Sequence, residues 1–441
     1  MLDAIADTIF APATPAGRAA IAVLRISGPD CGRAASLLAG GLPPPRVAQR
    51  RQVIDPASGN VLDEGLILWF PAPRSATGED VAEFHLHGSR AVLVAVMDAL
   101  RRLGMRLAEP GEFTRRAFLN GKLDLLQAEA IADLTAAETE AQRRQAMRQL
   151  GGELGDVYRG WRERLTRILA HLEAAIDFPD EDLPPDTEAR IISETEALVA
   201  EIARHLGDAR RGERLRDGID VAIVGPVNAG KSSLLNRIAR RDAAIISPIA
   251  GTTRDVIEVA IDLGGYPVVL ADTAGLRDSD DVIETEGKRR AVQRAAEAEI
   301  RLFVFDAGRP ADAAGAAAWP GPDTFLVANK IDLLPLPCSH LPAAAVPISA
   351  LTGEGVDTLL AALGERVAQN YQTEAPVLTR ARHREALEEA AASLRRSLDA
   401  WLAELRAEDL RLALRSLGRI TGAVDVEDLL DVIFRDFCIG K

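Results

Sequence analysis

Few cysteines and no long apolar run occur in the sequence, and each absence excludes a class of protein. The 441 residues include three cysteines, Cys31, Cys338 and Cys438, whose wide spacing fits neither a disulfide framework nor a zinc site. No run of about 18 apolar residues is present, so a membrane-spanning helix is not expected. Asp3 and Asp7 stand where a signal peptide has basic residues. These features predict a cytoplasmic protein with free thiols.

Positive charge is also scarce, because 52 lysines and arginines face 66 acidic residues and the formal net charge is −14. This balance disfavours broad, salt-driven binding to nucleic acid, so we expect no DNA partner, and an RNA partner must meet local basic patches. The apolar fraction of 47% and the charged fraction of 27% are those of a globular protein. A chain of this length predicts two to four domains.

The first ~120 residues predict a mixed α/β domain. Its expected strands and helix cover residues 19–27, 65–70, 81–86 and 90–103. Arg25 interrupts an apolar strand, and Glu83, His85 and His87 share one face of another because they alternate with apolar residues. A zinc site there lacks a further nearby ligand, so a polar face that lines a cleft is the favoured interpretation. A purely solvated face remains the alternative.

A basic, turn-rich connection at residues 110–124 leads into a pattern that is helical almost throughout from residue 125 to about 216. An acidic, proline-rich break at residues 178–185 interrupts it and predicts a helix–helix turn. Arg143, Arg144 and Arg148 lie on one of these helices, where a solvated face is the usual explanation and RNA contact the alternative.

The most specific motif is a Walker A phosphate loop within residues 220–236, where an apolar strand ends in Gly225 and Gly230-Lys231-Ser232 follow. The glycines allow backbone N–H groups to surround a phosphate, and the following helix presents its positive end. We expect Lys231 to reach the β and γ phosphates and the Ser232 hydroxyl to bind Mg²⁺.

Four further sequence features follow in the order of a GTPase. Thr253 is suited to ligate Mg²⁺ when a γ-phosphate is present, and Asp272-Thr273-Ala274-Gly275 ends a strand where a carboxylate can hold the Mg²⁺ shell. In Asn329-Lys330-Ile331-Asp332 the last carboxylate can accept both hydrogens of a guanine edge, whereas adenine would leave it facing an acceptor. Ser349-Ala350-Leu351 can place a backbone N–H against the guanine oxygen. An ATPase is the alternative that this order disfavours.

The position after the Asp-x-x-Gly motif is Leu276, which cannot orient an attacking water as a glutamine can. Glu284, in the segment 277–286, is the best-placed carboxylate for that role, and an exposed acidic loop residue is the alternative interpretation. Cys438, three residues before the terminal Lys441, lies after the last helical pattern, where a ligand can reach it, so we expect it to be a catalytic residue. A small buried residue chosen for packing is the alternative there.

The chain resembles the MnmE (TrmE) family of tRNA modification GTPases. The resemblance rests on GPVNAGKSSLLN, GTTRD, DTAGLR, NKID and the terminal CIGK together with TPAGR, LRISG, TGED and FLNGKLDL, and it runs the whole length. It implies a small α/β folate-binding and dimerisation domain followed by a helical domain into which a Ras-like P-loop GTPase domain is inserted. The expected segments are 1–120, 121–217 (helical), 218–377 (GTPase) and 378–441 (helical, with the tail).

By matching positions, the resemblance implies contacts of Arg25, Glu83, Lys122 and Lys441 with 5-formyl-tetrahydrofolate or a reactive relative such as methylene-tetrahydrofolate. It implies K⁺ ligands at Asn228, Ser247, Ile249 and Thr252 and a catalytic carboxylate at Glu284, beside Mg²⁺ at Ser232 and Thr253. The complete set of expected GTP-binding residues is Asn228, Ala229, Gly230, Lys231, Ser232, Ser233, Ser247, Thr252, Thr253, Asp272, Thr273, Ala274, Gly275, Asn329, Lys330, Asp332, Ser349, Ala350 and Leu351.

The resemblance further implies a homodimer that joins the FAD-dependent protein MnmG in a heterotetramer. This complex adds a carboxymethylaminomethyl or aminomethyl group to the wobble uridine of certain tRNAs, with a tetrahydrofolate one-carbon unit. The chain departs from the family pattern at Val227, where proline is usual, and in the Ala/Gly/Pro-rich stretch 311–322. A regulatory GTPase switch on RNA or the ribosome is the alternative, and a membrane-remodelling GTPase is disfavoured because no basic amphipathic helix is found.

Overall fold

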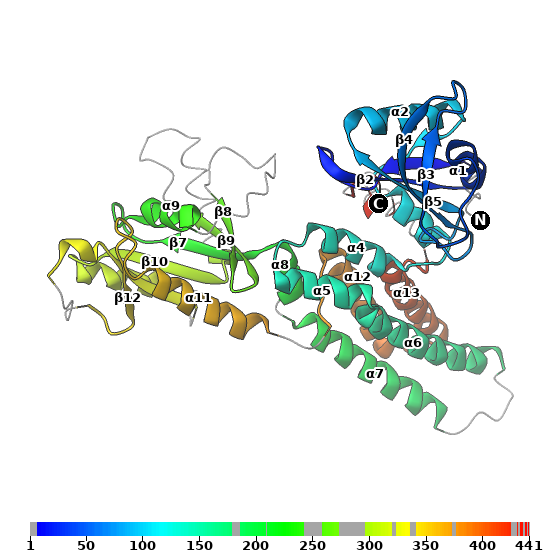
Figure 1. Ribbon diagram of the computed structural model, residues 1–441. Coiled ribbons are helices and arrows are strands. Elements are labelled where there is room, and N and C mark those ends of the chain that lie inside the picture. Colours follow the sequence, from blue (N-terminus) through cyan, green and yellow to red (C-terminus); the bar gives the residue numbers. More distant parts are fainter. Residues whose placement is uncertain are drawn as a thin grey trace, which may run out of the picture. The chain divides into compact units, whose positions relative to one another are not determined.

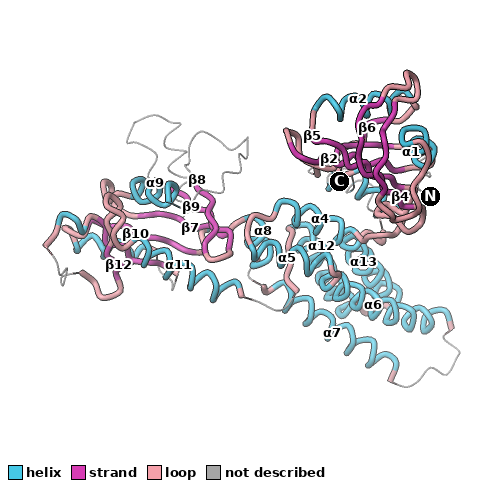
Figure 2. Tube along the Cα trace, viewed as in Figure 1, coloured by secondary structure: helices cyan, strands magenta, loops and turns pink. Residues whose placement is uncertain are grey.

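The computed structural model describes residues 7–178, 186–208, 210–241, 258–272, 296–319, 323–335, 341–372, 376–424, 430, 433–434, 437–438 and 440. The chain divides into two compact units, each assembled from separated segments. The first unit consists of Met1–Ala132, Leu150–Leu183 and Ala400–Lys441, and the second of Asp133–Gln149 and Pro184–Asp399. Each unit combines a sheet with helices, as Figure 2 shows.

The first unit contains a sheet with the strand order β3-β4-β5-β2-β1-β6. Its strands are β1 (Ile9–Pro12), β2 (Ala19–Ser27), β3 (Gln49–Ile54), β4 (Val61–Phe70), β5 (Val81–Gly88) and β6 (Arg106–Leu107). Neighbours are antiparallel except β1 and β6. Leu24, Ile26 and Phe84 alternate along β2 and β5 and enter a core shared with α1 (Cys31–Ala39) and α2 (Arg90–Arg102). Arg25 and Glu83 therefore lie on the opposite face.

The first unit also holds α3 (Glu112–Leu119), α6 (Glu153–Asp177), α13 (Ala403–Thr421) and the start of α4 (Leu125–Ala136). Helices α6 and α13 lie side by side in Figure 1, and Arg411 pairs with Glu173 between them at 2.8 Å. Phe434 and Phe437, near the chain end, pack against Leu125. The end of the chain is thereby held in the unit that contains the N-terminal sheet.

The second unit contains a sheet with the order β12-β11-β10-β7-β9-β8, parallel except for β8 against β9. Its strands are β7 (Ile219–Val224), β8 (Glu258–Leu263), β9 (Tyr266–Asp272), β10 (Ile300–Asp306), β11 (Thr324–Asn329) and β12 (Ala345–Pro347). Helices α9 (Lys231–Arg241) and α11 (Val356–Tyr371) share one core with these strands. Strands β9 and β10 lie on either side of β7, so the strand order reverses at its carboxyl end, where such sheets bind ligands.

The remaining elements of the second unit are α5 (Glu140–Leu150), α7 (Thr187–Leu206), α8 (Arg211–Asp217), α12 (Ala381–Asp399) and the 3₁₀ segments η1 (Pro310–Ala318) and η2 (Ile331–Leu333). The predicted fold class, two α/β sheets with a helical part, is confirmed. The four-segment division of the chain stays a prediction. One expectation is wrong: residues 112–119 form the helix α3 within the stretch that the sequence indicated as a connection. No helix of the described residues is long and apolar enough to cross a bilayer.

Candidate functional site

The phosphate loop follows β7 and leads into α9 at the reversal point of the second sheet. Gly225 has φ 137°, and a Cβ atom there would lie 2.0 Å from the Val304 carbonyl oxygen. Gly230 has φ 93°, and a Cβ atom there would lie 2.2 Å from the Asn329 side-chain nitrogen. Both positions therefore require glycine. Asn228 adopts a left-handed conformation as well, with φ 62°.

Lys231 and Ser232 begin α9 beside the end of β9. The Lys231 ammonium is buried and donates to the Gly225 and Pro226 carbonyl oxygens at 2.8 and 2.7 Å. Burial lowers its pKa below the ordinary value, and the Asp272 carboxylate acts in the opposite direction. The Ser232 hydroxyl donates to Asp272 Oδ2 at 2.5 Å. A cation for phosphates and two hard oxygen donors for a divalent metal thus lie together.

The motifs that begin at Asn329 and Ser349 lie beside the phosphate loop, although about a hundred residues separate them from it in the sequence. The Asn329 side chain donates to the Ala229 carbonyl at 2.8 Å and accepts from the Ala350 backbone N–H at 2.9 Å. The Ser349 hydroxyl donates to Asp332 Oδ1 at 2.5 Å. A cavity of about 470 Å³ lies beside Gly230, Asn329, Lys330, Asp332, Ala350 and Leu351, which is the size of small-molecule sites.

Most expected GTP-binding residues are among those described. The phosphate loop, Asp272, the Asn329–Asp332 motif and the Ser349–Leu351 motif are brought to one edge of the sheet. Ser233 also lines the base cavity. The expected residues that lie outside the described part are Ser247, Ile249, Thr252, Thr253, Thr273, Ala274, Gly275 and Glu284. Their roles stay predictions.

Arg25 and Glu83 form an ion pair on the polar face of the first sheet. They are directly opposite each other on β2 and β5, and Arg25 Nη2 lies 2.9 Å from Glu83 Oε1. His85 Nε2 lies 3.4 Å from the other Glu83 oxygen, and the Arg25 guanidinium lies 5.6 Å from the centre of the Phe113 ring. Among the described residues there is no cluster of three or more His, Cys, Asp or Glu side chains that could hold a metal ion.

A cavity of about 400 Å³ adjoins this pair. Glu83 and Lys122 both line it, and Lys122 Nζ donates to the Pro73 carbonyl oxygen at 3.2 Å. Three of the four expected folate contacts, counting Arg25 through its bond to Glu83, are therefore gathered in one place. The fourth, Lys441, lies outside the described residues.

Cys438 is exposed, and its carbonyl oxygen accepts a hydrogen bond from the Gly111 backbone N–H at 3.3 Å. Gly440 has φ 99°, and a Cβ atom there would lie 2.1 Å from the Pro12 carbonyl oxygen. Pro12 belongs to β1 and pairs with Leu24, next to Arg25. The tail therefore lies against strand β1 of the first unit.

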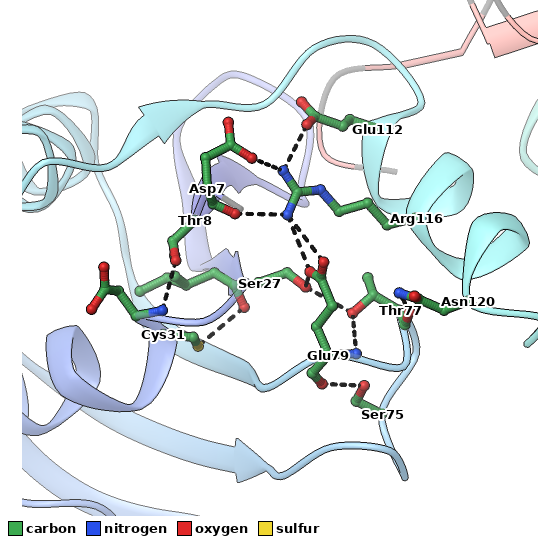
Figure 3. Close-up of polar contacts among 12 residues, drawn as sticks. Asp7, Thr8, Ser27, Cys31, Ser75, Thr77, Glu79, Glu112, Arg116 and Asn120 are labelled. Atoms are coloured by element: carbon green, nitrogen blue, oxygen red, sulfur yellow. Dashed lines mark hydrogen bonds and ion pairs between the residues drawn. The ribbon is translucent and has the colours of Figure 1, made fainter. Parts of the chain in front are cut away.

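The sequence did not indicate the buried ion network around Arg116, shown in Figure 3. Arg116 is fully buried, and its guanidinium contacts Asp7 Oδ1 at 2.7 Å, Glu112 Oε1 at 2.9 Å and Glu79 Oε1 at 3.2 Å. Burial would raise the pKa of Glu112, but hydrogen bonds, from Arg106 first and also from Arg116, hold that pKa below its ordinary value. Glu79 also accepts from the Ser27 hydroxyl at 2.7 Å, so the network fixes the loop before β5.

Arg116→Met should destabilise the first unit strongly, because it removes the fully buried guanidinium that joins Glu112 to Glu79. The expected loss is about 3–5 kcal/mol of unfolding free energy. Hydrogen exchange of the β2 and β5 amides measures it. Arg33→Met is the matched control: Arg33 is half-exposed on α1 of the same unit, pairs only with Asp30, and should change little. Equal protection in both variants would contradict a stabilising role of the network.

Comparison with known proteins identifies the family. The family model described as GTP-binding protein TrmE N-terminus matches residues 8–122, and that described as MnmE helical domain matches residues 125–438. Relatives from Rhodospirillum rubrum and Parvibaculum lavamentivorans, both described as tRNA modification GTPase MnmE, are each 58% identical over 99% of this chain and cover 99% and 100% of their own length. The solved G domain of the T. maritima FeoB iron transporter matches 35% of this chain and 99% of its own at 21% identity, with a TM-score of 0.25 that supports no argument. The chain therefore belongs to the MnmE (TrmE) family of tRNA modification GTPases.

Proposed function

We propose that this chain hydrolyses GTP and, with an FAD-dependent MnmG-like partner, adds a carboxymethylaminomethyl or aminomethyl group at C5 of the wobble uridine of certain tRNAs. GTP hydrolysis in tRNA modification is the activity of its family. The observation that carries the GTPase assignment is the meeting of Asn329, Asp332 and Ala350 around a cavity that also borders Gly230 of the phosphate loop. A carboxylate and a backbone N–H at these places match the donor and acceptor edge of guanine.

Magnesium fits the nucleotide site, because the Ser232 hydroxyl and the Asp272 carboxylate are hard oxygen donors at one place. The bound ion would neutralise charge on the phosphates. Lys231, already buried beside the loop, would exchange its two backbone acceptors for phosphate oxygens. Potassium would bind at Asn228 with Ser247, Ile249 and Thr252 of the following segment.

The modification half of the function assigns the N-terminal pocket to a tetrahydrofolate derivative. A guanidinium and a carboxylate side by side, as in Arg25 and Glu83, can satisfy the acceptor and donor edges of a pterin ring. Lys122 lines the same pocket and supplies a cation for a carboxylate or formyl oxygen. Cys438 and Lys441 would complete the site from the tail, within a homodimer that binds the FAD-dependent partner as a heterotetramer.

Mass spectrometry of tRNA nucleosides tests the modification. Cells that lack this protein should lose the carboxymethylaminomethyl and aminomethyl groups at the wobble uridine, and the intact gene should restore them. Unchanged wobble nucleosides would refute the proposal and leave the regulatory switch.

Potassium dependence is the expected signature of turnover. A cation held by Asn228 supplies positive charge between the phosphates, so the hydrolysis rate should be about tenfold or more higher in K⁺ than in Na⁺. Asn228→Ala should remove this difference. Asn228→Gly distinguishes loss of the side-chain amide from backbone strain, because glycine adopts φ 62° without strain. If the amide is what matters, the glycine variant should hydrolyse GTP as slowly as the alanine variant. Equal rates in the two salts, measured by phosphate release, would exclude the cation site.

Glu284→Ala should lower the rate constant of hydrolysis with GTP affinity nearly intact, as expected for a residue that acts only in the transition state.

A further inference from the structure

The pocket of about 400 Å³ in the first unit has an ordered series of side-chain types along its wall. Glu83 lies on β5 opposite Leu68 of β4, and Val81 lies two residues earlier, opposite Phe70. Two residues along a strand span about 7 Å. The Arg46 guanidinium lies 5.7 Å from the centre of the Phe70 ring, and Arg74 lines the pocket beside it. The wall thus leads from a carboxylate past an aromatic ring to two guanidinium groups.

Positive side chains outnumber negative ones in the lining of this pocket, which contains Glu83 but also Arg46, Arg74 and Lys122. The Glu83 carboxylate is already paired with Arg25 at 2.9 Å. Arg46, Arg74 and Lys122 have no carboxylate partner within the described part of the chain; Arg46 and Lys122 donate instead to backbone carbonyl oxygens at positions 74 and 73. Within the described part of the chain, the pocket is therefore lined by three cationic side chains that no carboxylate neutralises.

Arg46 is also held in place by its backbone. Its φ is 63°, a left-handed conformation that costs a non-glycine residue free energy, and its N–H donates to the Trp69 carbonyl oxygen at 2.8 Å. Such strained residues concentrate at ligand-binding sites. Its side chain is further fixed by the Phe70 ring and by the hydrogen bond to the Arg74 carbonyl. A guanidinium that is pre-organised in this way loses little entropy when it binds an anion.

We propose that Arg46 and Arg74 bind the glutamate carboxylates of a reduced folate and make the pocket selective for glutamylated forms. This inference rests on the proposed folate function of the same pocket. A folate consists of a pterin, an aminobenzoyl ring and one or more glutamates, which is the order of complementary groups along the wall: the Arg25–Glu83 pair, Phe70 with Val81, and the two arginines. Planar guanidinium groups match carboxylates in two parallel hydrogen bonds.

Calorimetry of the full-length protein with three probes tests this selectivity. The probes are 5-formyl-tetrahydrofolate with three glutamates, the same compound with one glutamate, and tetrahydropteroate, which has none. Wild type should bind them in this order of decreasing affinity. Arg46→Ala and Arg74→Ala should each weaken binding of the glutamylated probes about 3- to 10-fold, as expected for partly exposed charged pairs, and leave tetrahydropteroate unchanged.

Arg50→Ala is the matched control, because Arg50 lies on β3 of the same unit, is 75% exposed and pairs with Glu64. It removes the same charge and should alter none of the three affinities. If wild type binds all three probes and the Arg46 and Arg74 variants keep its order of affinities, the arginines do not read the glutamates. Equal loss for tetrahydropteroate, or loss of tRNA binding with folate affinity intact, would also overturn the inference. No binding of any probe by wild type would instead refute the folate function itself.

Discussion

Replacing Cys438 by serine is expected to abolish wobble-uridine modification while GTP hydrolysis stays near the wild-type rate. The Cys438 side chain is exposed, whereas Phe434 and Phe437 before it enter the core, so the substitution removes no packing. Serine has nearly the same shape, but its hydroxyl is a far weaker nucleophile than a thiol at neutral pH. No residue of the nucleotide pocket belongs to the unit that contains Cys438. Complementation followed by nucleoside mass spectrometry measures the first effect, and phosphate release the second.

Cys31→Ser is the control for this experiment. Cys31 is fully buried in α1, and its thiol points to the Ile26 carbonyl oxygen at 3.5 Å. Burial raises the pKa of this thiol well above its ordinary value, so it has no thiolate to offer. The Cys31 variant should keep modification even where its stability falls. If Cys438→Ser modifies tRNA normally, Cys438 is a structural residue and its catalytic assignment is wrong.

The nucleotide site could be predicted from the sequence because each of its parts is local. Gly230, Lys231 and Ser232 are consecutive, the strand β7 ends at Val224 shortly before them, and the helix α9 begins at Lys231. Parallel strands bring their carboxyl ends to one edge, so motifs that each end a strand must meet. The contacts of Asn329 with Ala229 and Ala350 are the result.

The N-terminal pocket could be predicted only in part. Alternation along β2 and β5 indicated a polar face for Arg25 and Glu83, and the two side chains lie on one face, where they form an ion pair. An ion pair without a ligand is the alternative to a folate contact, so that role stays a prediction. The alternation did not predict how β2 and β5 are aligned, so it did not predict that Arg25 would lie opposite Glu83, 58 positions away in the sequence. The position of Arg46 could not be predicted from the sequence. It depends on a left-handed backbone conformation at Arg46 itself, and no glycine or asparagine, the residues that usually adopt this conformation, stands there to indicate it.

The Arg116 network could not be predicted, for two physical reasons. Glu112 is a local partner four residues earlier on the same helix, but Asp7 and Glu79 are distant in the sequence, so only the tertiary fold brings them to Arg116. Helix α3 itself has eight residues between Gly111 and Asn120, too few for a helical period to show. A charged residue that is fully buried is rare, and the sequence around it is basic and polar like that of a loop. The burial of Arg116 could therefore be recognised only from the structure, which places three carboxylates around its guanidinium.

Asp332→Asn is expected to change the nucleotide preference from GTP to xanthosine triphosphate. Asp332 accepts the Ser349 hydroxyl at one oxygen, and the hydroxyl is in turn fixed by the Thr352 backbone N–H at 3.1 Å. An asparagine would keep its oxygen toward Ser349 and present an amide donor to the base. The exocyclic amine of guanine would then face the amide N–H₂ of the asparagine, and both groups are donors. Xanthine has an acceptor oxygen at the same position and would pair with the amide. The affinity for GTP should fall about 100-fold or more, because the amide of the variant and the guanine amine would be left unpaired where the bound base covers them.

Competition against a fluorescent nucleotide measures both affinities. Asp312→Asn removes the same charge from η1 of the same unit and should leave the preference for GTP unchanged. An effect of charge alone would strengthen binding of both anionic nucleotides slightly in both variants, whereas lost pairing weakens only GTP and only at Asp332. If Asp332→Asn binds GTP as tightly as wild type, the carboxylate does not face the guanine edge. The cavity beside Asn329 and Ala350 would then have to recognise the base by shape, and the assignment of guanine specificity to this residue would be wrong.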